Sequence, residues 1–208
     1  YGRVYTQDIT LSGAKYVYSQ PALPWHLLRS YDDLKADPVP EKTRPLAWIT
    51  SARTGRKGHR KRMTFLDHLH KSGMDFDLWG RGFTPIDNKW DGLSVARCAL
   101  AIENHRTPFY WTEKLADCFL SWTLPLYYGA SNITDFFPAE AIVQIDINQP
   151  KEAMAIIEAA TQGSLWQKRL DAIAHARELV LEKYQFFPVV VDQIRQHEAA
   201  VSQPAPED

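Results

Sequence analysis

Short apolar runs recur along the middle of the chain and alternate with segments of helical periodicity. The runs predict buried strands at 46–50, 76–79, 99–102, 124–128 and 141–145. Between them, apolar residues spaced three or four apart predict amphipathic helices at 59–71 and 112–122. Strands that alternate with helices in this way indicate an α/β fold, a Rossmann-like parallel sheet with flanking helices.

The flanks of this region have weaker patterns. Residues 1–45 are broken by prolines, and we expect only a short strand at 16–18 and a short helix at 27–34. Residues 150–200 have helical periodicity, with a break expected near Pro188, and the Pro- and acid-rich tail 202–208 is predicted to be disordered. The predicted organisation is a connecting region or remnant of another domain at 1–40, one domain at 41–200, and a tail at 201–208.

Composition and charge narrow the class of protein. The 208 residues are 45% apolar and 24% charged, with a net charge of −1, as in ordinary soluble domains. No apolar run approaches the roughly 20 residues of a membrane helix, and the chain opens without a signal peptide or an initiator Met, as a fragment or processed chain would. Cys98 and Cys118 lie in apolar runs and are predicted to be buried free thiols. We expect a cytoplasmic protein, and peripheral association with a bacterial inner membrane stays open.

A basic segment follows the first predicted strand of the domain. Residues 53–62 contain six Lys or Arg together with Gly55 and Gly58, which would let the backbone approach an anion closely. A pyrophosphate site is one interpretation; a solvated basic loop or a nucleic-acid patch are the alternatives. No aromatic side chain interrupts the run, and the spacing is not that of a Walker motif.

The start of the helix predicted at 112–122 is a second candidate site. The Thr112 hydroxyl can cap the helix, whose free N–H groups suit a phosphate. Lys114 adds a positive charge there, and the Glu113 carboxylate can accept from the paired hydroxyls of a ribose. Tyr110 precedes the cap in a loop, where its hydroxyl is free to serve a ligand. The alternative is a capped and solvated helix start.

The spacing of residues along the sequence supports neither a metal site nor a catalytic nucleophile. The seven histidines show no metal-ligand spacing, and no Asp-x-Asp motif follows a predicted strand. Because cations are abundant near the candidate site, we expect no obligatory metal or other cofactor.

Several spaced motifs occur in order over roughly residues 40–190. Glu103-Asn104 is followed by Tyr110-Trp111-Thr112-Glu113-Lys114 and by the strand Leu124 to Gly129. Further segments are Trp48 to Ser51, Arg62 to Leu66, Leu78 to Gly82 and Asp135 to Pro138. Together these motifs resemble the hallmarks of family 10 fucosyltransferases.

The resemblance implies one half of a GT-B glycosyltransferase, the carboxyl-terminal domain that binds GDP-fucose. It implies that Arg62 and Lys114 bind the pyrophosphate, that Glu113 holds the ribose, and that Asn104 and Tyr110 line the donor site. Further donor-site candidates are Ser51, Gly80, Glu103, Thr112 and Gly129. The general base would lie in the amino-terminal domain, most of which this chain is expected to lack, so no catalytic residue is assigned.

The expected activity is inverting transfer of L-fucose to a hydroxyl of a galactose- or N-acetylglucosamine-containing glycan, in the biosynthesis of a lipopolysaccharide or another glycan. GDP-fucose and the glycan acceptor are the expected partners, without nucleic acid. Two alternatives stay open: a family relative that uses another nucleotide sugar, and a nucleic-acid-binding module that uses residues 53–62.

Overall fold

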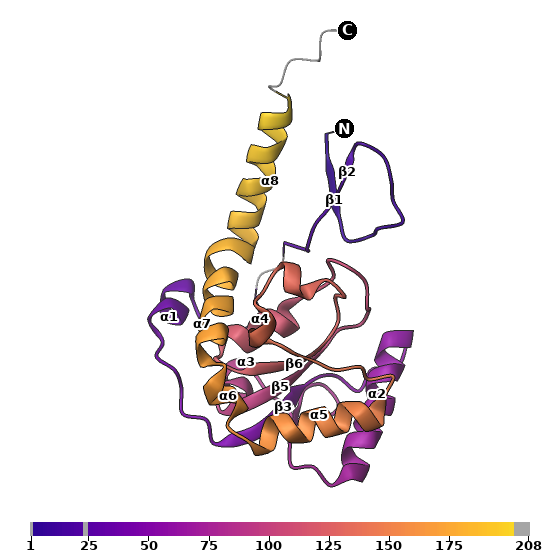
Figure 1. Cartoon of the computed structure of the whole chain (residues 1–208), viewed down its shortest axis with the longest axis vertical. Coiled ribbons are helices and arrows are strands. Elements are labelled where there is room, and N and C mark those ends of the chain that lie inside the picture. Colours follow the sequence, from indigo (N-terminus) through magenta and orange to yellow (C-terminus); the bar gives the residue numbers. More distant parts are fainter. Residues whose placement is uncertain (1, 23–24, 202–208) are drawn as a thin grey trace.

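A five-stranded parallel sheet, in the order β4-β3-β5-β6-β7, forms the centre of the protein in a computed structural model that describes residues 2–22 and 25–201 (Figure 1). The strands are β3 (Arg44–Ile49), β4 (Asp77–Trp79), β5 (Ala96–Ile102), β6 (Leu124–Tyr128) and β7 (Val143–Gln144). This confirms the predicted parallel sheet. The last strand is shorter than predicted, because a 3-10 turn at Ala139–Ala141 occupies its expected start. The predicted tail at 202–208 lies outside the described residues.

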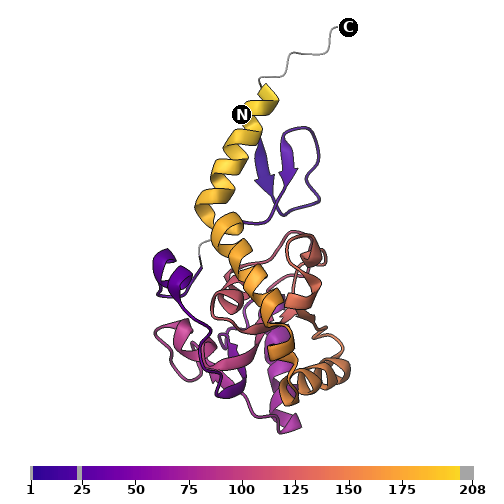
Figure 2. The ribbon, with the colours of Figure 1, turned by 60° about the vertical axis from the view of Figure 1, so that its left-hand side comes forward.

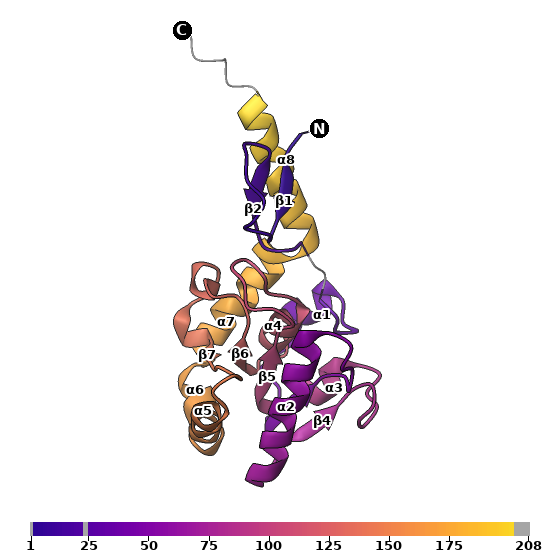
Figure 3. The ribbon, with the colours of Figure 1, turned by 90° about the vertical axis from the view of Figure 1, so that its right-hand side faces the viewer.

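Helices cover both faces of the sheet, as alternation along β5 requires. Leu100 and Ile102 point into one apolar cluster, and Ala99 and Ala101 into the other. The helices on the first face are α2 (Lys57–Ser72), α5 (Pro150–Gln162) and α6 (Leu165–Lys168). The helices on the second face are α3 (Lys89–Leu93), α4 (Glu113–Leu120) and α7 (Leu170–Leu179). On the first face α2 and α5 also contact each other (Figure 3).

The long carboxyl-terminal helix leaves this domain and lies beside the amino-terminal segment. A π-helical stretch (Val180–Tyr184) links α7 to α8 (Phe186–Val201), which extends away from the sheet (Figure 1). The parallel pair β1 (Val4–Thr6) and β2 (Tyr16–Tyr18) runs alongside α8 (Figure 2). The Tyr5 hydroxyl donates to the Gln193 carbonyl at 2.8 Å. None of the helices in the described part of the chain is long and apolar enough to span a bilayer.

The predicted break near Pro188 falls at Gln185, whose backbone is extended between the π-helical stretch and α8. Pro188 itself lies in the first turn of α8, where its missing N–H leaves no helical bond unmade.

Local signals misplaced some helix boundaries. The helix expected at 27–34 is α1 (Tyr31–Ala36), because Ser30 caps it by accepting from the backbone N–H of Asp33. Leu27 and Leu34 are nevertheless both buried in the core. The helix expected to reach Trp122 ends at Leu120, and Trp122, with φ of 59°, packs against the cluster on the opposite face from α4.

The strand order fixes where a ligand can bind. β3 comes first in the sheet by sequence, β4 is added on one side of it, and β5 on the other. The connections after β3 and β5 therefore diverge, and the crevice between their carboxyl ends is the topological switch point at which open α/β sheets bind ligands.

The start of α2 approaches this point closely, and the approach depends on Gly58. A Cβ at Gly58 would lie 2.1 Å from the backbone oxygen of Asn104, which follows the end of β5. The packing of α2 against the end of β5 therefore requires glycine at this position whether or not an anion binds nearby.

Gly58→Ala is expected to lower the free energy of unfolding by about 1–3 kcal/mol, because α2 must shift away from β5. Gly55 is the matched control: a Cβ added there would meet no atom within 4 Å beyond its neighbours in the chain, so Gly55→Ala should change stability by less than about 1 kcal/mol. Urea unfolding of both variants checks this, and equal stability would contradict the close approach.

Candidate functional site

A cavity of about 480 Å³ opens at the switch point, above the carboxyl ends of β3, β4 and β5. Six of the residues predicted from the sequence line it: Ser51, Arg62, Gly80, Asn104, Glu113 and Lys114. Gly80 is required there by its backbone, because its φ is 119° and a Cβ would lie 1.9 Å from the Thr50 oxygen.

Arg62 is the side chain in this cavity that most clearly lacks a partner. It is 5% exposed, and its Nε is buried without a hydrogen bond. Among the described residues it forms no ion pair. Burial lowers the pKa of the guanidinium, and the nearby Glu103, Tyr110 and Glu113 only partly oppose that shift. A buried cation without a partner is unfavourable, so an anion at this position would remove an existing cost.

The first turn of α4 is anchored from below by a buried carboxylate. Thr112 caps the helix, as predicted, by accepting from the Lys114 N–H at 3.4 Å. Glu103, which has no exposed side-chain surface, accepts from the Thr112 N–H and from the Thr112 hydroxyl, both at 2.7 Å. Burial raises the pKa of Glu103, and Lys114 and Thr112 act against that rise.

The ammonium group of Lys114 already has partners within the protein, which its predicted role did not foresee. Its Nζ donates to Glu103 Oε2 at 3.2 Å, to Glu113 Oε1 at 3.1 Å and to the Thr112 hydroxyl at 3.0 Å. Burial lowers the pKa of Lys114, but the two carboxylates outweigh it and the net shift is upward. Burial likewise acts to raise the pKa of Glu113. The positive charges of Lys114 and, to a smaller extent, Lys89 outweigh this effect, so the pKa of Glu113 lies below its usual value.

The remaining predicted residues surround the cavity without lining it. Glu103 and Thr112 are buried beneath it. Gly129 is buried too, since a Cβ there would lie 2.7 Å from Glu103 Cγ and 2.1 Å from the Tyr127 hydroxyl. Tyr110 is half-buried, with its ring edge-on to His105. Tyr127 is buried in the core.

The basic segment 53–62 is divided by the helix that it begins. Arg53 and His59 face the same cavity as Arg62, and burial together with these arginines lowers the pKa of His59. Lys57 and Lys61 face a smaller cavity of about 280 Å³ on the other side of α2. The segment therefore contributes to two surfaces instead of one continuous basic patch.

Lys89 and Arg81 also line the main cavity, and sequence reasoning did not find them. Lys89 begins α3, a five-residue helix too short to show periodicity. The available signal was Asn88, whose side chain accepts from the Trp90 N–H as a helix cap.

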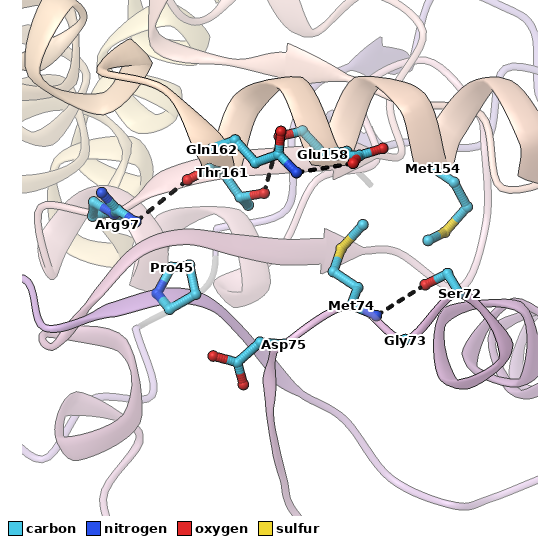
Figure 4. Close-up of a pocket in the computed structure, with 10 residues that line it drawn as sticks. All are labelled: Pro45, Ser72, Gly73, Met74, Asp75, Arg97, Met154, Glu158, Thr161 and Gln162. Carbon is cyan, nitrogen blue, oxygen red and sulfur yellow. Dashed lines mark hydrogen bonds between the residues drawn. The ribbon is translucent and has the colours of Figure 1, made fainter.

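A second cavity, of about 460 Å³, lies near the amino ends of the strands, opposite the main cavity (Figure 4). Pro45 and Arg97 come from the amino ends of β3 and β5, and Met74 and Asp75 from the loop before β4. Arg97 already donates to the Thr161 carbonyl at 3.3 Å. Because ligands of parallel sheets bind outside the carboxyl ends of the strands, the cavity with Arg62 is the stronger candidate.

Within the described residues, no three His, Cys, Asp or Glu side chains are close enough together to hold a metal ion. Cys98 and Cys118 are buried free thiols, as predicted. Burial raises the pKa of the Cys98 thiol to about 12, which leaves it unreactive at neutral pH.

Comparison with known proteins gives a consistent result at the level of sequence. The sequence pattern described as Glycosyltransferase family 10 (fucosyltransferase) C-term matches residues 39–163. The 4-galactosyl-N-acetylglucosaminide 3-alpha-L-fucosyltransferase 9 of Cricetulus griseus is 28% identical over 120 residues, which are 55% of this chain and 32% of that protein. An Alpha-(1,4)-fucosyltransferase of Arabidopsis thaliana is 41% identical over 51 residues, 24% of this chain and 13% of that protein. The chain thus spans about a third of the length of the first of these relatives.

Solved structures share the fold. An alpha1,3-fucosyltransferase with GDP has a TM-score of 0.58 at 16% identity, over 90% of this chain and 72% of that one. An alpha1,3-fucosyltransferase with GDP-fucose has a TM-score of 0.55 at 17% identity, over 89% of this chain and 72% of that one.

Proposed function

The chain belongs to glycosyltransferase family 10, the fucosyltransferases, and on that premise we propose that its main cavity binds GDP-fucose. The reaction is inverting transfer of fucose to a hydroxyl of a galactose- or N-acetylglucosamine-containing glycan. Arg62 is the observation that carries the proposal. Its planar guanidinium is buried, without an ion pair in the described part of the chain, at the carboxyl ends of β3 and β5. A diphosphate offers oxygens in the geometry that a guanidinium binds with two parallel hydrogen bonds.

Other residues of the cavity would bind the rest of the diphosphate and the ribose. The first turn of α4 directs its partial positive charge at the same anion. Lys114 adds a second cation, which must exchange part of its contact with Glu103 and Glu113 for the ligand. Glu113, released from Lys114, can accept from the hydroxyls of the ribose, and Asn104 lines the cavity between these groups.

Transfer separates charge, because negative charge develops on the departing GDP. Arg62 and Lys114, whose side chains are largely buried, stabilise that charge. An acceptor hydroxyl must also lose its proton to a general base. We propose that this base and the acceptor site belong to an amino-terminal lobe, of which residues 1–40 form a part, so that this chain supplies the donor half.

Titration calorimetry with GDP tests the proposal. We expect GDP to bind the folded chain at a single site, and absence of binding at millimolar GDP would contradict the proposal. GDP-mannose and UDP-galactose, compared with GDP-fucose, address the alternative that the chain uses another nucleotide sugar. Tighter binding of either one would favour that alternative.

Divalent metal should have little effect on this binding. Arg62, Lys114 and the start of α4 supply the positive charge that a metal supplies in other nucleotide-sugar enzymes. We therefore expect the dissociation constant of GDP to stay within about twofold when EDTA replaces manganese in the buffer. Loss of binding in EDTA, restored by manganese, would show that a metal completes the site.

A further inference from the structure

Helix α4 carries a second buried carboxylate, on the side facing α3. Asp117 is 1% exposed, and its Oδ2 accepts from Lys89 Nζ at 2.8 Å while its Oδ1 accepts from the His26 N–H at 2.9 Å. Both oxygens are therefore fixed, and they fix the Lys89 ammonium in turn. Asp117 is the one hydrogen-bond acceptor of Lys89 among the described residues, so the ammonium, a donor of three bonds, has donors to spare.

Lys89 reaches the main cavity beside the start of α4, because its partner Asp117 lies about one helical turn after Glu113 on that helix. Arg62, Asn104 and the start of α4 lie near the end of β5. From there the cavity passes Thr50 and Ser51 after β3 and reaches Gly80 after the edge strand β4. Lys89 follows this segment along the chain, but α3 packs over β3 and β5 and brings Lys89 back to α4.

Glu113 lies within electrostatic reach of both lysines, since Lys114 and Lys89 each lower its pKa. A ligand with its diphosphate at Arg62 and its ribose at Glu113 would therefore place its nucleoside beside Lys89, which lines the same cavity and has 25% of its side chain exposed.

We propose that Lys89, held by Asp117, binds the nucleoside half of the nucleotide sugar by donating to acceptor atoms of the base or ribose. This rests on the proposed function, because it takes the diphosphate position from Arg62 and Lys114. Asp117 is a positioning residue: it orients Lys89 and the backbone at His26 without touching the ligand.

The test compares a ligand that has a nucleoside with one that lacks it. Calorimetry of wild type and Lys89→Met with GDP and with pyrophosphate should show GDP binding weakened about ten- to a hundredfold, the loss of one hydrogen bond from a charged group, and pyrophosphate binding within about twofold. Lys89→Arg, which keeps the donors and the charge, should restore most of the GDP affinity. Lys35, which also pairs with one carboxylate but lies outside the cavity, is the control, and Lys35→Met should bind both ligands as wild type does.

Lys89→Met leaves Asp117 buried without its cation, so the variant Lys89→Met/Asp117→Asn, which removes both charges, is measured in parallel. Unchanged GDP affinity in a folded variant would reduce Lys89 to a structural partner of Asp117 and overturn the proposal. Equal losses for GDP and pyrophosphate would make Lys89 a phosphate ligand and overturn it as well. Failure of the wild type to bind GDP would contradict the proposed function itself, whereas wild-type binding with an insensitive Lys89 contradicts this inference alone.

Discussion

Arg62→Met is expected to weaken GDP binding by at least about a hundredfold while leaving the free energy of unfolding unchanged or raising it. Two charge-assisted hydrogen bonds to a diphosphate are worth about 1.5–3 kcal/mol each, and each 1.4 kcal/mol is a factor of ten in affinity. The free energy of unfolding should not fall, because the guanidinium is buried without a hydrogen bond at Nε. Methionine keeps the apolar stem and removes the desolvated charge.

Arg60 provides the control on the same helix. It is exposed, and its Nη1 donates to the Thr54 carbonyl at 3.2 Å instead of facing the main cavity. Arg60→Met should therefore change neither GDP affinity nor stability appreciably. Arg62→Lys should fall between wild type and Arg62→Met, because it keeps the charge and loses the planar fork. Calorimetry and urea unfolding measure the two quantities, and an Arg62→Met protein that is less stable but binds GDP normally would assign Arg62 to the scaffold.

The parallel sheet was predictable because strands covered on both faces read as uninterrupted apolar runs. β5 and β6 are such strands: β6 has its predicted bounds, and β5 begins three residues before its predicted start, at Ala96. β1 and α3 were not predicted, because elements of three and five residues are too short to show a period, although the equally short β2 is observed at its predicted bounds, 16–18. The same limit shifted α1, whose start is set by one capping residue, Ser30.

The site was predictable in outline for a different reason. Parallel strands place their carboxyl ends on one edge, so residues after β3 and β5 had to converge. The choice of Arg62 among six basic residues came from family resemblance, although its position on the buried face of α2 would also have indicated it. Arg62, Leu66 and Leu69 are spaced four and three apart, and all are buried on one side of α2.

Partners set by tertiary structure could not be predicted. The contact of Lys114 with Glu103 joins the start of α4 to the end of β5, and the contact of Lys89 with Asp117 joins α3 to α4. No local pattern encodes either distance. The sequence therefore suggested an exposed lysine at a helix start, whereas the folded chain holds that lysine between two carboxylates.

This pairing changes what substitution of Lys114 should do. Lys114→Met is expected to weaken GDP binding by about one to two orders of magnitude, the loss of one charge-assisted contact. It should also lower the free energy of unfolding at pH 7 by about 3 kcal/mol, because Glu103 stays fully buried without its cation. Lys151 serves as the control, since it too begins a helix but is exposed on α5. Lys151→Met should change neither the GDP affinity nor the free energy of unfolding.

The stability loss should depend on pH in a direction fixed by Glu103. Burial raises the pKa of this carboxyl, and Lys114 is the largest influence that lowers it. The pKa of Glu103 is raised already in the wild type, and loss of Lys114 raises it further, so the folded variant retains a proton at a pH where an unfolded glutamate, with a pKa of about 4.3, has released it. Stability of the variant should therefore rise relative to wild type as the pH falls from 7 toward 5. Glu113 adds nothing in this pH window, because its pKa is lowered and its stabilising contact with Lys114 is lost only below about pH 4.3.

A double-mutant cycle separates the buried charge from other effects of the substitution. In Glu103→Gln/Lys114→Met the amide oxygen can accept from the Thr112 N–H, and the amide nitrogen can donate to the Thr112 hydroxyl that Lys114 no longer contacts. The double variant should then be more stable than Lys114→Met by about 1–2 kcal/mol, within the range of coupling energies between residues in contact. Glu103→Gln alone should be destabilised, because its amide nitrogen must face a donor, either the Thr112 N–H or Lys114 Nζ. Additive effects in urea unfolding, with no pH dependence of the Lys114→Met loss, would mean that the two side chains do not form the buried pair that anchors the start of α4.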